Sequence, residues 1–591
     1  MFGLWRLALL IGQNVAYLRG KPYWWALPII SGKATMVLSA LHRSQHLQYL
    51  QQHTFDVLVI GGGITGAGIA LDAASRGLRT ALVEKNDFAS GTSSRSTKLI
   101  HGGLRYLKQF EIALVREVGR ERATVHKLAP HLVVPEKMIL PLVDGGTYGK
   151  LATSVGLFVY DVLAGVERPD QRVMLSTEEA LEKEPLLDPK GLRGAGYYAE
   201  YRTDDARLTV EVMKTAAQHG ALCLNYLEVK DFVYKDGKVE GVQITDHLTG
   251  NSLEAKAKVV VSAAGPWVDE LREINKSLEG KRLHLTKGVH IVVPHGKLPL
   301  HQSIYFDVPD GRMIFAIPRG EVTYVGTTDT DYHDDPNRVV AEREDVDYLL
   351  NAVNAVFPDI TLEVEDVVST WAGLRPLIHE DGKSASQLSR KDEIFESDNG
   401  LLSIAGGKLT GYRKMAERIV DRVKRRLEKE GGEDIPKCRT DEITLIGGDF
   451  GNYEAVRGYI AELKDQAVGQ GLTQTDVNYL VHLYGHQANI ILDKMLAIDE
   501  QYPAPVRMGL AELEYGLEHE AVQTPLDFFN HRTGRLYFRI ETIAPLKDAV
   551  CERLAKVLGW DKATWQRHVS ALDQAIADVA EHFKNKPNTA Q

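Results

Sequence analysis

The sequence is poor in cysteine and carries a net negative charge. Its 591 residues contain three cysteines, Cys223, Cys438 and Cys551, far apart and without a C-x-x-C pair. This spacing excludes a redox dithiol or a cysteine-based zinc site and argues against a disulfide framework. We therefore predict no metal and a reducing compartment. The formal net charge of -10 argues against nucleic acid as a main partner.

Acidic residues are absent before Asp56. Residues 1–52 combine basic side chains with two short apolar patches, neither of which approaches the roughly 20 residues of a membrane span. Basic charge beside Trp24 and Trp25 suits contact with an anionic membrane surface. A cleaved transit peptide or a start codon placed too far upstream explains the same pattern. We therefore predict a targeting or membrane-contacting extension over residues 1–52.

A dinucleotide-binding pattern follows this segment. The β-branched run at residues 57–60 predicts a buried parallel strand. Gly61, Gly63 and Gly66 follow in G-x-G-x-x-G spacing, and residues 64–76 predict a helix. These glycines allow a tight turn, close approach of a pyrophosphate and close packing of helix on strand. The helix N-terminus would then face that pyrophosphate.

The next strand completes the pattern. Residues 80–83 are apolar and end at Glu84. A carboxylate about twenty residues after the glycines is placed to accept hydrogen bonds from ribose hydroxyls. The strand, helix, second strand and acid together predict a nucleotide site, which the glycines alone would not.

A second strand–glycine–helix junction lies near the end of the central region. Residues 401–405 predict a buried strand, Gly406 and Gly407 follow, and residues 409–427 predict a helix. Two such junctions suit a long cofactor, and FAD could place its adenosine end at the first and its flavin at the second. A helix N-terminus near the flavin would stabilise negative charge on it.

A polar loop at residues 87–107 follows the nucleotide pattern. Its first half is rich in hydroxyls that could cap a helix or donate to phosphate or ribose. Its second half places His101, Arg105 and Tyr106 around a pair of glycines. A loop that merely joins two elements is the alternative, but so many donors beside a nucleotide site favour contact with a ligand.

The rest of the chain divides into strand-rich and helical regions. Asp205 is a good N-cap for a helix, and residues 235–237 predict a hairpin turn. The alternating pattern of residues 284–331 predicts an antiparallel sheet that forms a substrate-binding layer. From residue 435 onward the pattern is helical, which predicts a C-terminal domain for packing, oligomerisation or partner contact.

The candidate substrate residues are strongly cationic. They are His101, Arg105, Tyr106, Arg312, Arg375 and Lys408. Arginine binds phosphate in bidentate geometry, so several basic residues at one site imply an anionic and phosphorylated substrate.

An ordered set of motifs resembles one family. SGTSSRSTKLIHGGLRYL, GPWVDEL, TKGVHIVVP, GTTDTDY, WAGLRPL and GGKLTGYRKMAE together resemble the FAD-dependent glycerol-3-phosphate dehydrogenases. The match covers residues 55–414 and, more weakly, the C-terminal helical region. The resemblance implies oxidation of sn-glycerol 3-phosphate to dihydroxyacetone phosphate, with hydride passing from C2 to flavin N5 and electrons then to membrane quinone.

The resemblance also implies roles for particular residues. Arg105, Tyr106 and Arg312 would bind phosphate, and Thr327 or Thr328 would add a hydroxyl contact. Arg375 and Lys408 would lie near the reacting hydroxyl. The predicted FAD contacts are Gly61, Gly63, Thr65, Gly66, Glu84, Thr92, Ser93, Ser94, Thr97, Lys98, Leu99, Gly265, Gly406, Gly407, Lys408, Leu409 and Thr410.

The general base stays open among three interpretations. His101 and His290 have a suitable intrinsic pKa for this role. A group of arginines could instead lower the pKa of the substrate hydroxyl. Either histidine could also serve only packing or a hydrogen bond to the flavin.

The expected fold class is α/β with several domains. We predict a discontinuous Rossmann-like FAD-binding domain at residues 53–110, 200–280 and 365–430. A substrate or cap domain would occupy residues 111–199 and 281–364, so the two together span 53–430. A helical domain would form residues 435–591.

Several alternatives remain at the level of sequence. The resemblance separates subtypes. Related glycerophosphate oxidases, which produce hydrogen peroxide, are associated with a long insert after the GLRPL motif, so the short segment here favours a dehydrogenase. Mitochondrial relatives carry C-terminal EF-hand loops, so their absence from this sequence favours a bacterial-type enzyme. A flavin-binding protein without turnover is disfavoured by the cationic residues, and an NAD-linked enzyme by the second glycine junction. We expect a peripheral protein on the cytoplasmic face of a bacterial membrane, with the mitochondrial inner membrane and a homodimer as open alternatives.

Overall fold

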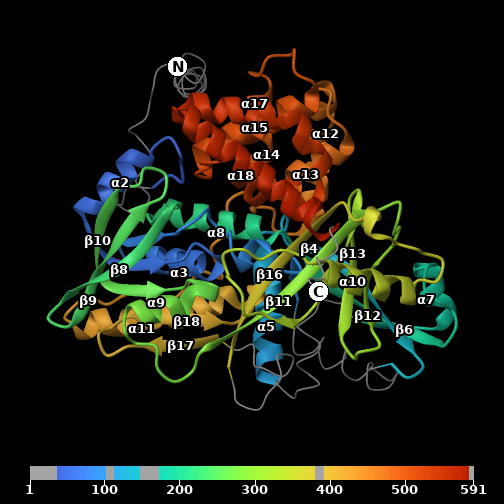
Figure 1. The fold of residues 1–591 in the computed structure, drawn as a ribbon, viewed down its shortest axis with the longest axis horizontal. Helices are drawn as coiled ribbons and strands as arrows, with labels where there is room; N and C mark the ends of the chain where they lie inside the picture. The colour runs from blue at the N-terminus through green and yellow to red at the C-terminus, as the bar shows by residue number, and fades with distance from the viewer. Residues whose placement is uncertain (1–35, 102–111, 147–171, 380–391, 585–591) are drawn as a thin grey trace, which may run out of the picture.

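The structure is a computed structural model that describes residues 36–101, 112–146, 172–379 and 392–584. Two sheets lie side by side, and the C-terminal helices, orange to red in Figure 1, form a layer across them. This arrangement confirms the α/β fold class with a C-terminal helical domain. Within the described ranges, every helix is too short or too polar to cross a bilayer.

The first sheet, sheet A, is built on the nucleotide pattern. Its order is β17-β18-β10-β1-β2-β7, with β8 and β9 attached through β10. The strands are β1 (Thr54–Ile60), β2 (Thr80–Val83), β7 (Leu222–Leu224), β8 (Leu227–Lys235), β9 (Lys238–Asp246), β10 (Ser252–Ser262), β17 (Asp392–Glu396) and β18 (Leu402–Gly406). β18, β10, β1, β2 and β7 are parallel neighbours, as the buried apolar runs predict.

Helices cover this sheet as the local sequence predicts. The pattern at residues 64–76 forms α3 (Ile64–Ser75), which packs against α8 (Asp205–Gln218) and α11 (Tyr412–Lys429). The expected hairpin turn at residues 235–237 joins β8 to β9. The other helices near this sheet are α2 (Arg43–Gln52), α5 (Ile112–Leu128) and α9 (Val268–Ile274).

The N-cap of α8 is one residue earlier than predicted. The side chain of Asp204 accepts a hydrogen bond from the Arg207 amide, as an N-cap does. The carboxylate of Asp205 instead turns away from the cap and pairs with Lys98. The two adjacent aspartates cannot be told apart by local sequence because both are good capping residues.

The second sheet, sheet B, is mainly antiparallel, as expected for a substrate layer. Its order is β15-β11-β14-β13-β12-β4-β6-β3, with β16 on β11 and β5 on β6. The strands are β3 (Leu99–Ile100), β4 (Val134–Val143), β5 (Val173–Leu175), β6 (Leu192–Arg202), β11 (Leu283–Pro294), β12 (Ser303–Asp307), β13 (Met313–Arg319), β14 (Val322–Gly326), β15 (Thr330–Asp331) and β16 (Ser369–Ile378). Helices α7 (Thr177–Lys183) and α10 (Arg343–Val356) accompany this sheet.

Three segments lie elsewhere than the predicted domain bounds place them. β3 and β16 fall in the predicted FAD-binding segments but are hydrogen-bonded into sheet B. Residues 36–52 fall in the predicted N-terminal extension, yet Leu38 and Leu50 are buried and Arg43 pairs with Asp246. A targeting or membrane role therefore remains a prediction for residues 1–35 alone, which lie outside the described residues.

The C-terminal layer is helical. Its elements are α12 (Tyr453–Gly469), α13 (Gln474–Tyr484), α14 (Ala488–Met495), α15 (Ala504–His519), the π-helical turn η10 (Asp527–Arg532), α16 (Arg535–Phe538), α17 (Ile543–Leu558) and α18 (Lys562–Ala580). Tyr537 and Phe538 join a buried apolar cluster with Trp371 of β16. The layer thus packs directly against sheet B.

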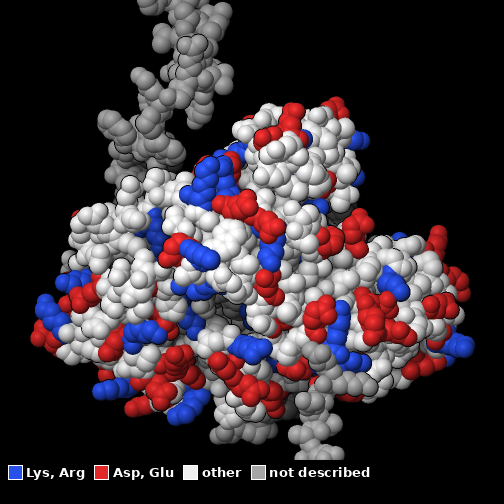
Figure 2. Space-filling model, turned by 45° about the horizontal axis from the view of Figure 1, so that its top comes forward, with Lys and Arg blue, Asp and Glu red and all other residues white. Residues whose placement is uncertain are grey.

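Charged side chains of both signs are mixed on the face that Figure 2 shows. In the view of Figure 2, lysine and arginine alternate with aspartate and glutamate, and neither sign forms one continuous field. This face therefore lacks, among the described residues, the single basic stripe typical of nucleic-acid binding.

Candidate active site

An elongated cavity joins the two glycine-rich junctions. It is lined by residues of the β1–α3 turn, by Ala263 to Gly265 after β10, and by Gly406 to Leu409 after β18. Its empty space is about 1320 Å³, part of which opens to solvent. Because β18, β10 and β1 are adjacent parallel strands, their carboxyl ends meet at one edge of sheet A. We call this space the first cavity.

The β1–α3 turn brings backbone to backbone. A Cβ atom at Gly66 would lie 1.9 Å from the carbonyl oxygen of Gly61, and one at Gly61 would lie 2.5 Å from the carbonyl oxygen of Ala263. Only glycine leaves room for these approaches. The first-turn amides of α3 have no acceptors within the helix, so those other than the Ile64 amide are left as donors for an anion. Ser93 accepts a hydrogen bond from the Ile64 amide at 3.0 Å and lines the same cavity.

Glu84 lies in the first cavity, at the end of β2. Its carboxylate accepts hydrogen bonds from the Gly62 amide at 2.6 Å and from the Asn86 amide at 2.8 Å. Burial raises the pKa of Glu84, although both amides favour the ionised form. The two amides fix the carboxylate in one orientation, which is the arrangement that recognition of a ribose requires.

Replacing Glu84 by alanine should weaken FAD retention. The ribose hydroxyls and the two amides would lose their acceptor, at about 1–3 kcal/mol, which is about tenfold to a hundredfold in affinity. FAD content after ultrafiltration measures this, with substrate KM in excess FAD expected to stay unchanged. The control is Glu254→Ala, which replaces an exposed glutamate of β10 and should leave FAD retention unchanged. Unchanged FAD retention in Glu84→Ala would show that the ribose role is wrong.

A second cavity adjoins the first. Both are lined by Thr92, Ser96, Lys408 and Leu409. The second holds about 680 Å³ of empty space, and its other lining residues are Arg95, Thr97, Leu99, His101, Gly288, His290, Gly373, Leu374, Arg375 and Thr410. Three cationic side chains, those of Arg95, Arg375 and Lys408, thus line a space directly beside the glycine-rich one. Such a space suits an anionic ligand.

Arg375 is held in place from three sides. Its guanidinium donates to the Thr327 hydroxyl at 3.0 Å, to the carboxylate of Asp329 at 3.1 Å and to the Thr328 carbonyl at 3.3 Å. The guanidinium also occupies the space above Gly288, where a Cβ atom would lie 2.3 Å from it. The cation is therefore fixed at the cavity wall before any ligand arrives.

His290 is a buried and fixed ring. It stacks on Trp371 at 4.6 Å, and its Nε2 lies 3.1 Å from the hydroxyl of Thr97. Gly326 makes room for it, since a Cβ atom there would lie 2.1 Å from the ring. Burial, with the charges of Arg375 and Lys98, holds the pKa of His290 well below its ordinary value. These surroundings therefore favour the neutral form of the ring.

The structure brings most of the sequence-predicted residues to these two cavities. Residues lining the first are Gly61, Gly63, Thr65, Glu84, Thr92, Ser93, Gly265, Gly406, Gly407, Lys408 and Leu409. Residues lining the second are Thr92, Thr97, Leu99, His101, His290, Arg375, Lys408, Leu409 and Thr410. Gly66 lies behind the wall, and Thr327 and Thr328 act on Arg375. Arg105 and Tyr106 lie outside the described residues.

Three predicted contacts lie away from the cavity walls. Arg312 pairs with Asp310, two residues earlier, and lies over the ring of Tyr348. The ammonium of Lys98 is buried against Asp205 at 2.5 Å, and the Ser94 hydroxyl donates to the Gly91 carbonyl. The roles of Arg312 in phosphate binding and of Lys98 and Ser94 in cofactor binding therefore have no support from this geometry, because each side chain is already engaged elsewhere.

Sequence reasoning missed three residues of the site. Arg95 lines the second cavity, Trp267 lines the first, and Asp329 orients Arg375. Each lies inside a motif that the sequence analysis quoted, so its position was visible. The direction of each side chain could not be predicted. The hydroxyl-rich loop, for example, has no hydrophobic periodicity that would show which of its side chains face the ligand.

The donors and acceptors of the first cavity fit FAD. Backbone amides at the α3 N-terminus suit the pyrophosphate, and the Glu84 carboxylate suits the ribose. Gly406 and Gly407, at the end of β18, line the other end of the same cavity. The cavity is continuous between these groups, as the length of FAD requires.

Comparison with known proteins agrees with this reading. The family model described as FAD dependent oxidoreductase matches residues 56–413, and the one described as C-terminal domain of alpha-glycerophosphate oxidase matches residues 438–565. The aerobic glycerol-3-phosphate dehydrogenase of Bacillus subtilis is 50% identical over 544 residues, which are 92% of this chain and 98% of that protein. The protein of that name in Staphylococcus aureus is 48% identical over 93% of this chain and 99% of its own length.

The chain belongs to the FAD-dependent glycerol-3-phosphate dehydrogenase family.

Solved structures support the same assignment. The glycerol-3-phosphate dehydrogenase of Bacillus halodurans complexed with FAD is 44% identical, with a TM-score of 0.79 over 93% of this chain and 100% of that chain. The FAD-bound L-α-glycerophosphate oxidase of Mycoplasma pneumoniae is 20% identical, with a TM-score of 0.50 over 63% of this chain and 95% of that chain, and shares the fold alone. This member of the dehydrogenase family is therefore an enzyme whose cofactor is FAD, as predicted.

Proposed function

We propose that this enzyme oxidises sn-glycerol 3-phosphate to dihydroxyacetone phosphate and passes the electrons to membrane quinone. The observation that carries the proposal is the cationic second cavity, which shares Lys408 with the cavity that fits FAD. A substrate bound by its phosphate in the second cavity would hold its carbon chain against the flavin end of the first. The names of the relatives support the same substrate.

The chemistry is the loss of a hydride and a proton from one carbon–oxygen unit. Bound FAD supplies the hydride acceptor at N5. As the C2–H bond breaks, the hydroxyl proton leaves and its oxygen carries negative charge until the carbonyl forms. Arg375 and Lys408 line the cavity where this charge would develop, and a preorganised cation is the strongest means of stabilising it. Arg95 adds positive charge for the phosphate.

The position of the two histidines separates their roles. His290 is buried, stacked and hydrogen-bonded to Thr97, so it orients the wall of the cavity. His101 is half-buried, lies edge-on to Phe315 and lines the cavity itself. We assign His101 as the residue that receives the hydroxyl proton, with Arg375 lowering the pKa of that hydroxyl.

Two kinds of enzyme oxidise this substrate, and they differ in the electron acceptor. A dehydrogenase passes electrons to quinone, whereas an oxidase passes them to oxygen and releases hydrogen peroxide. The short segment between Leu377 and Asn399 supports the dehydrogenase. A quinone acceptor would place the enzyme peripherally at the membrane, on its cytoplasmic face in a bacterium, with residues 1–35 as a candidate contact.

Steady-state assays with two acceptors test this proposal. With sn-glycerol 3-phosphate, turnover with a soluble quinone should far exceed turnover in air, because the family assignment favours the dehydrogenase. Peroxide should be a minor product. The acceptor-specific rate and the peroxide yield are measured on the same holoenzyme, with glycerol as the control substrate that lacks phosphate. Rapid turnover in air with stoichiometric peroxide would favour the oxidase.

A further inference from the structure

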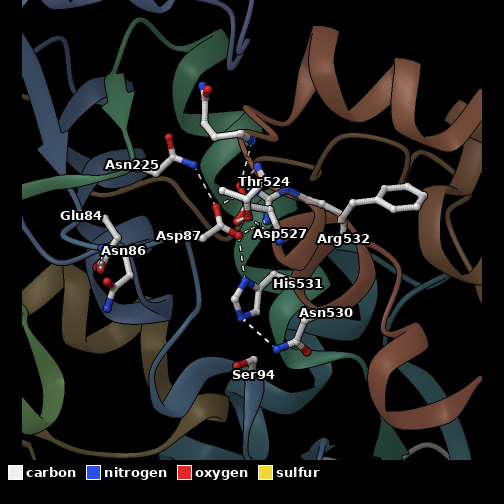
Figure 3. Close-up of polar contacts among 12 residues, drawn as sticks. Glu84, Asn86, Asp87, Ser94, Asn225, Thr524, Asp527, Asn530, His531 and Arg532 are labelled. Carbon is white, nitrogen blue, oxygen red and sulfur yellow. Dashed lines mark hydrogen bonds and ion pairs between the residues drawn. The ribbon is translucent and has the colours of Figure 1, made fainter. Parts of the chain in front are cut away.

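The carboxylate of Asp87 is the centre of a buried polar cluster between two domains. Asp87 lies three residues after Glu84 in the β2–η3 loop, where η3 spans Thr92–Ser94, and is 2% exposed. The guanidinium of Arg532 donates hydrogen bonds to both carboxylate oxygens, at 2.7 and 2.8 Å. His531 donates from Nδ1 at 2.8 Å, and Asn225 donates from its amide at 2.9 Å. Figure 3 shows these groups converging on Asp87.

Two of these partners come from the C-terminal helical domain. His531 and Arg532 end the π-helical turn η10, and both are buried. Arg532 also donates to the Glu520 carbonyl, and Asn225 to the Ala521 carbonyl, so the cluster is anchored in that domain at several points. Although burial alone would raise it, the charge of Arg532 and the hydrogen bonds from His531 and Arg532 hold the pKa of Asp87 well below its usual range.

The same loop carries two walls of the first cavity. On one side of Asp87, the Asn86 amide orients the carboxylate of Glu84. On the other side, the Asp87 carbonyl accepts a hydrogen bond from the amide of Ser90 at 3.2 Å, and Ser90 lines the cavity. A shift of Asp87 would therefore move both walls.

A second connection reinforces this one. The Tyr226 amide donates to the Asn86 carbonyl at 2.8 Å, while the Tyr226 hydroxyl donates to Asp527 of η10 at 2.5 Å. Asp87 and Tyr226 thus tie the loop to one turn of the C-terminal domain, and none of the described residues of that domain lines either cavity. A separate contact, of Tyr537 and Phe538 with Trp371, connects the domain to His290 in the wall of the second cavity.

We propose that Asp87, His531 and Arg532 are positioning residues through which the C-terminal domain sets the affinity of the β2–η3 loop for FAD. Docking of that domain preorganises Glu84 and Ser90 for the adenosine half of the cofactor. Because coupling between two binding events is reciprocal, bound FAD also strengthens docking of the C-terminal domain. The inference concerns the cofactor site and is independent of the substrate and of the electron acceptor.

Arg532→Lys in the full-length holoenzyme is the primary test. Lysine keeps the charge but loses the bidentate grip, so Asp87 stays paired while its position relaxes. We expect FAD to partition into the ultrafiltrate with an affinity weakened about tenfold, a typical coupling between sites. In excess FAD, kcat and KM should return to wild-type values. Added FAD should also protect the C-terminal domain of Arg532→Lys from limited proteolysis, but less than it protects that domain in the wild-type enzyme.

Arg535→Lys is the matched control. Arg535 is an equally buried arginine of the same domain, but its partner Glu512 lies within that domain. Its replacement should lower the stability of the domain while FAD affinity stays at the wild-type value. If Arg532→Lys does not fold, His531→Leu replaces it as the test. This variant loses one hydrogen bond to Asp87, so its affinity for FAD should also fall, but by less.

The outcomes separate positioning from plain stability. Weaker FAD retention in Arg532→Lys, rescued in excess FAD and absent in Arg535→Lys, supports the proposal. Wild-type retention in Arg532→Lys, or equal weakening in both variants, overturns it. Failure of sn-glycerol 3-phosphate as a substrate would leave this result unaffected, since the measured quantity is FAD affinity.

Discussion

Replacing Arg375 by alanine is expected to lower kcat by about 10²–10³-fold, the usual cost of removing one preorganised charge from a reaction site. FAD should stay bound, because Arg375 lines the second cavity and not the first. The loss should appear in kcat and kcat/KM together, since the charge is needed most as the hydroxyl proton leaves. Steady-state kinetics and flavin absorbance on the same sample measure both parts.

Two further variants make this result specific. Arg375→Lys keeps a positive charge near Asp329 but loses the fork of hydrogen bonds, so its kcat should lie between those of wild type and Arg375→Ala. Arg193→Ala removes an arginine that is 67% exposed and pairs with Asp144 on the surface, and it should behave as wild type. Normal turnover in Arg375→Ala would rule out its assigned role.

Replacing Gly66 by alanine is expected to abolish stable FAD binding. The added Cβ would overlap the Gly61 carbonyl, which is backbone and cannot rotate aside. Helix α3 would have to move away from β1, at a cost of about 1–3 kcal/mol or more. The movement would carry the first-turn amides away from the pyrophosphate. Flavin content of the purified variant and its Tm are the measurements.

Gly458→Ala gives the matched control for this substitution. Gly458 lies in α12, is exposed, and a Cβ there meets no heavy atom within 4 Å. Alanine at this position should stabilise the protein by about 0.5–1 kcal/mol, because glycine is a poor helix former. A Gly66→Ala variant with a full complement of FAD would contradict the packing described for the β1–α3 turn.

The sequence was most informative where one short segment determines its own structure. The run from β1 through α3 to β2 was predicted with nearly correct bounds, because its glycines, apolar period and terminal acid all act within thirty residues of one another. The junction at Gly406 and Gly407 was found for the same reason. Both junctions meet at one cavity because β1, β10 and β18 are adjacent parallel strands, and of these the sequence predicted a parallel strand only at residues 57–60.

The position of a side chain was hardest to predict where another charged residue binds it. Lys98 was expected at the cofactor, but Asp205, which lies far away in the sequence, binds its ammonium. Arg312 was expected at the phosphate, although Asp310 competes for it within the same turn. Arg532 lies in none of the motifs found in the sequence. Its role could not be predicted because its partner, Asp87, lies in another domain. Local sequence does not show the pairings of Lys98 and Arg532, because each partner lies far away in the sequence.

The most direct test of the account is an anaerobic half-reaction. sn-Glycerol 3-phosphate is added to FAD-loaded wild-type enzyme without any acceptor, and flavin absorbance is followed in time. The account predicts rapid bleaching in wild type, bleaching slower by about 10²–10³-fold in Arg375→Ala, and none with glycerol. A wild-type sample with a full complement of FAD that fails to bleach would contradict the assignment of the second cavity to this substrate.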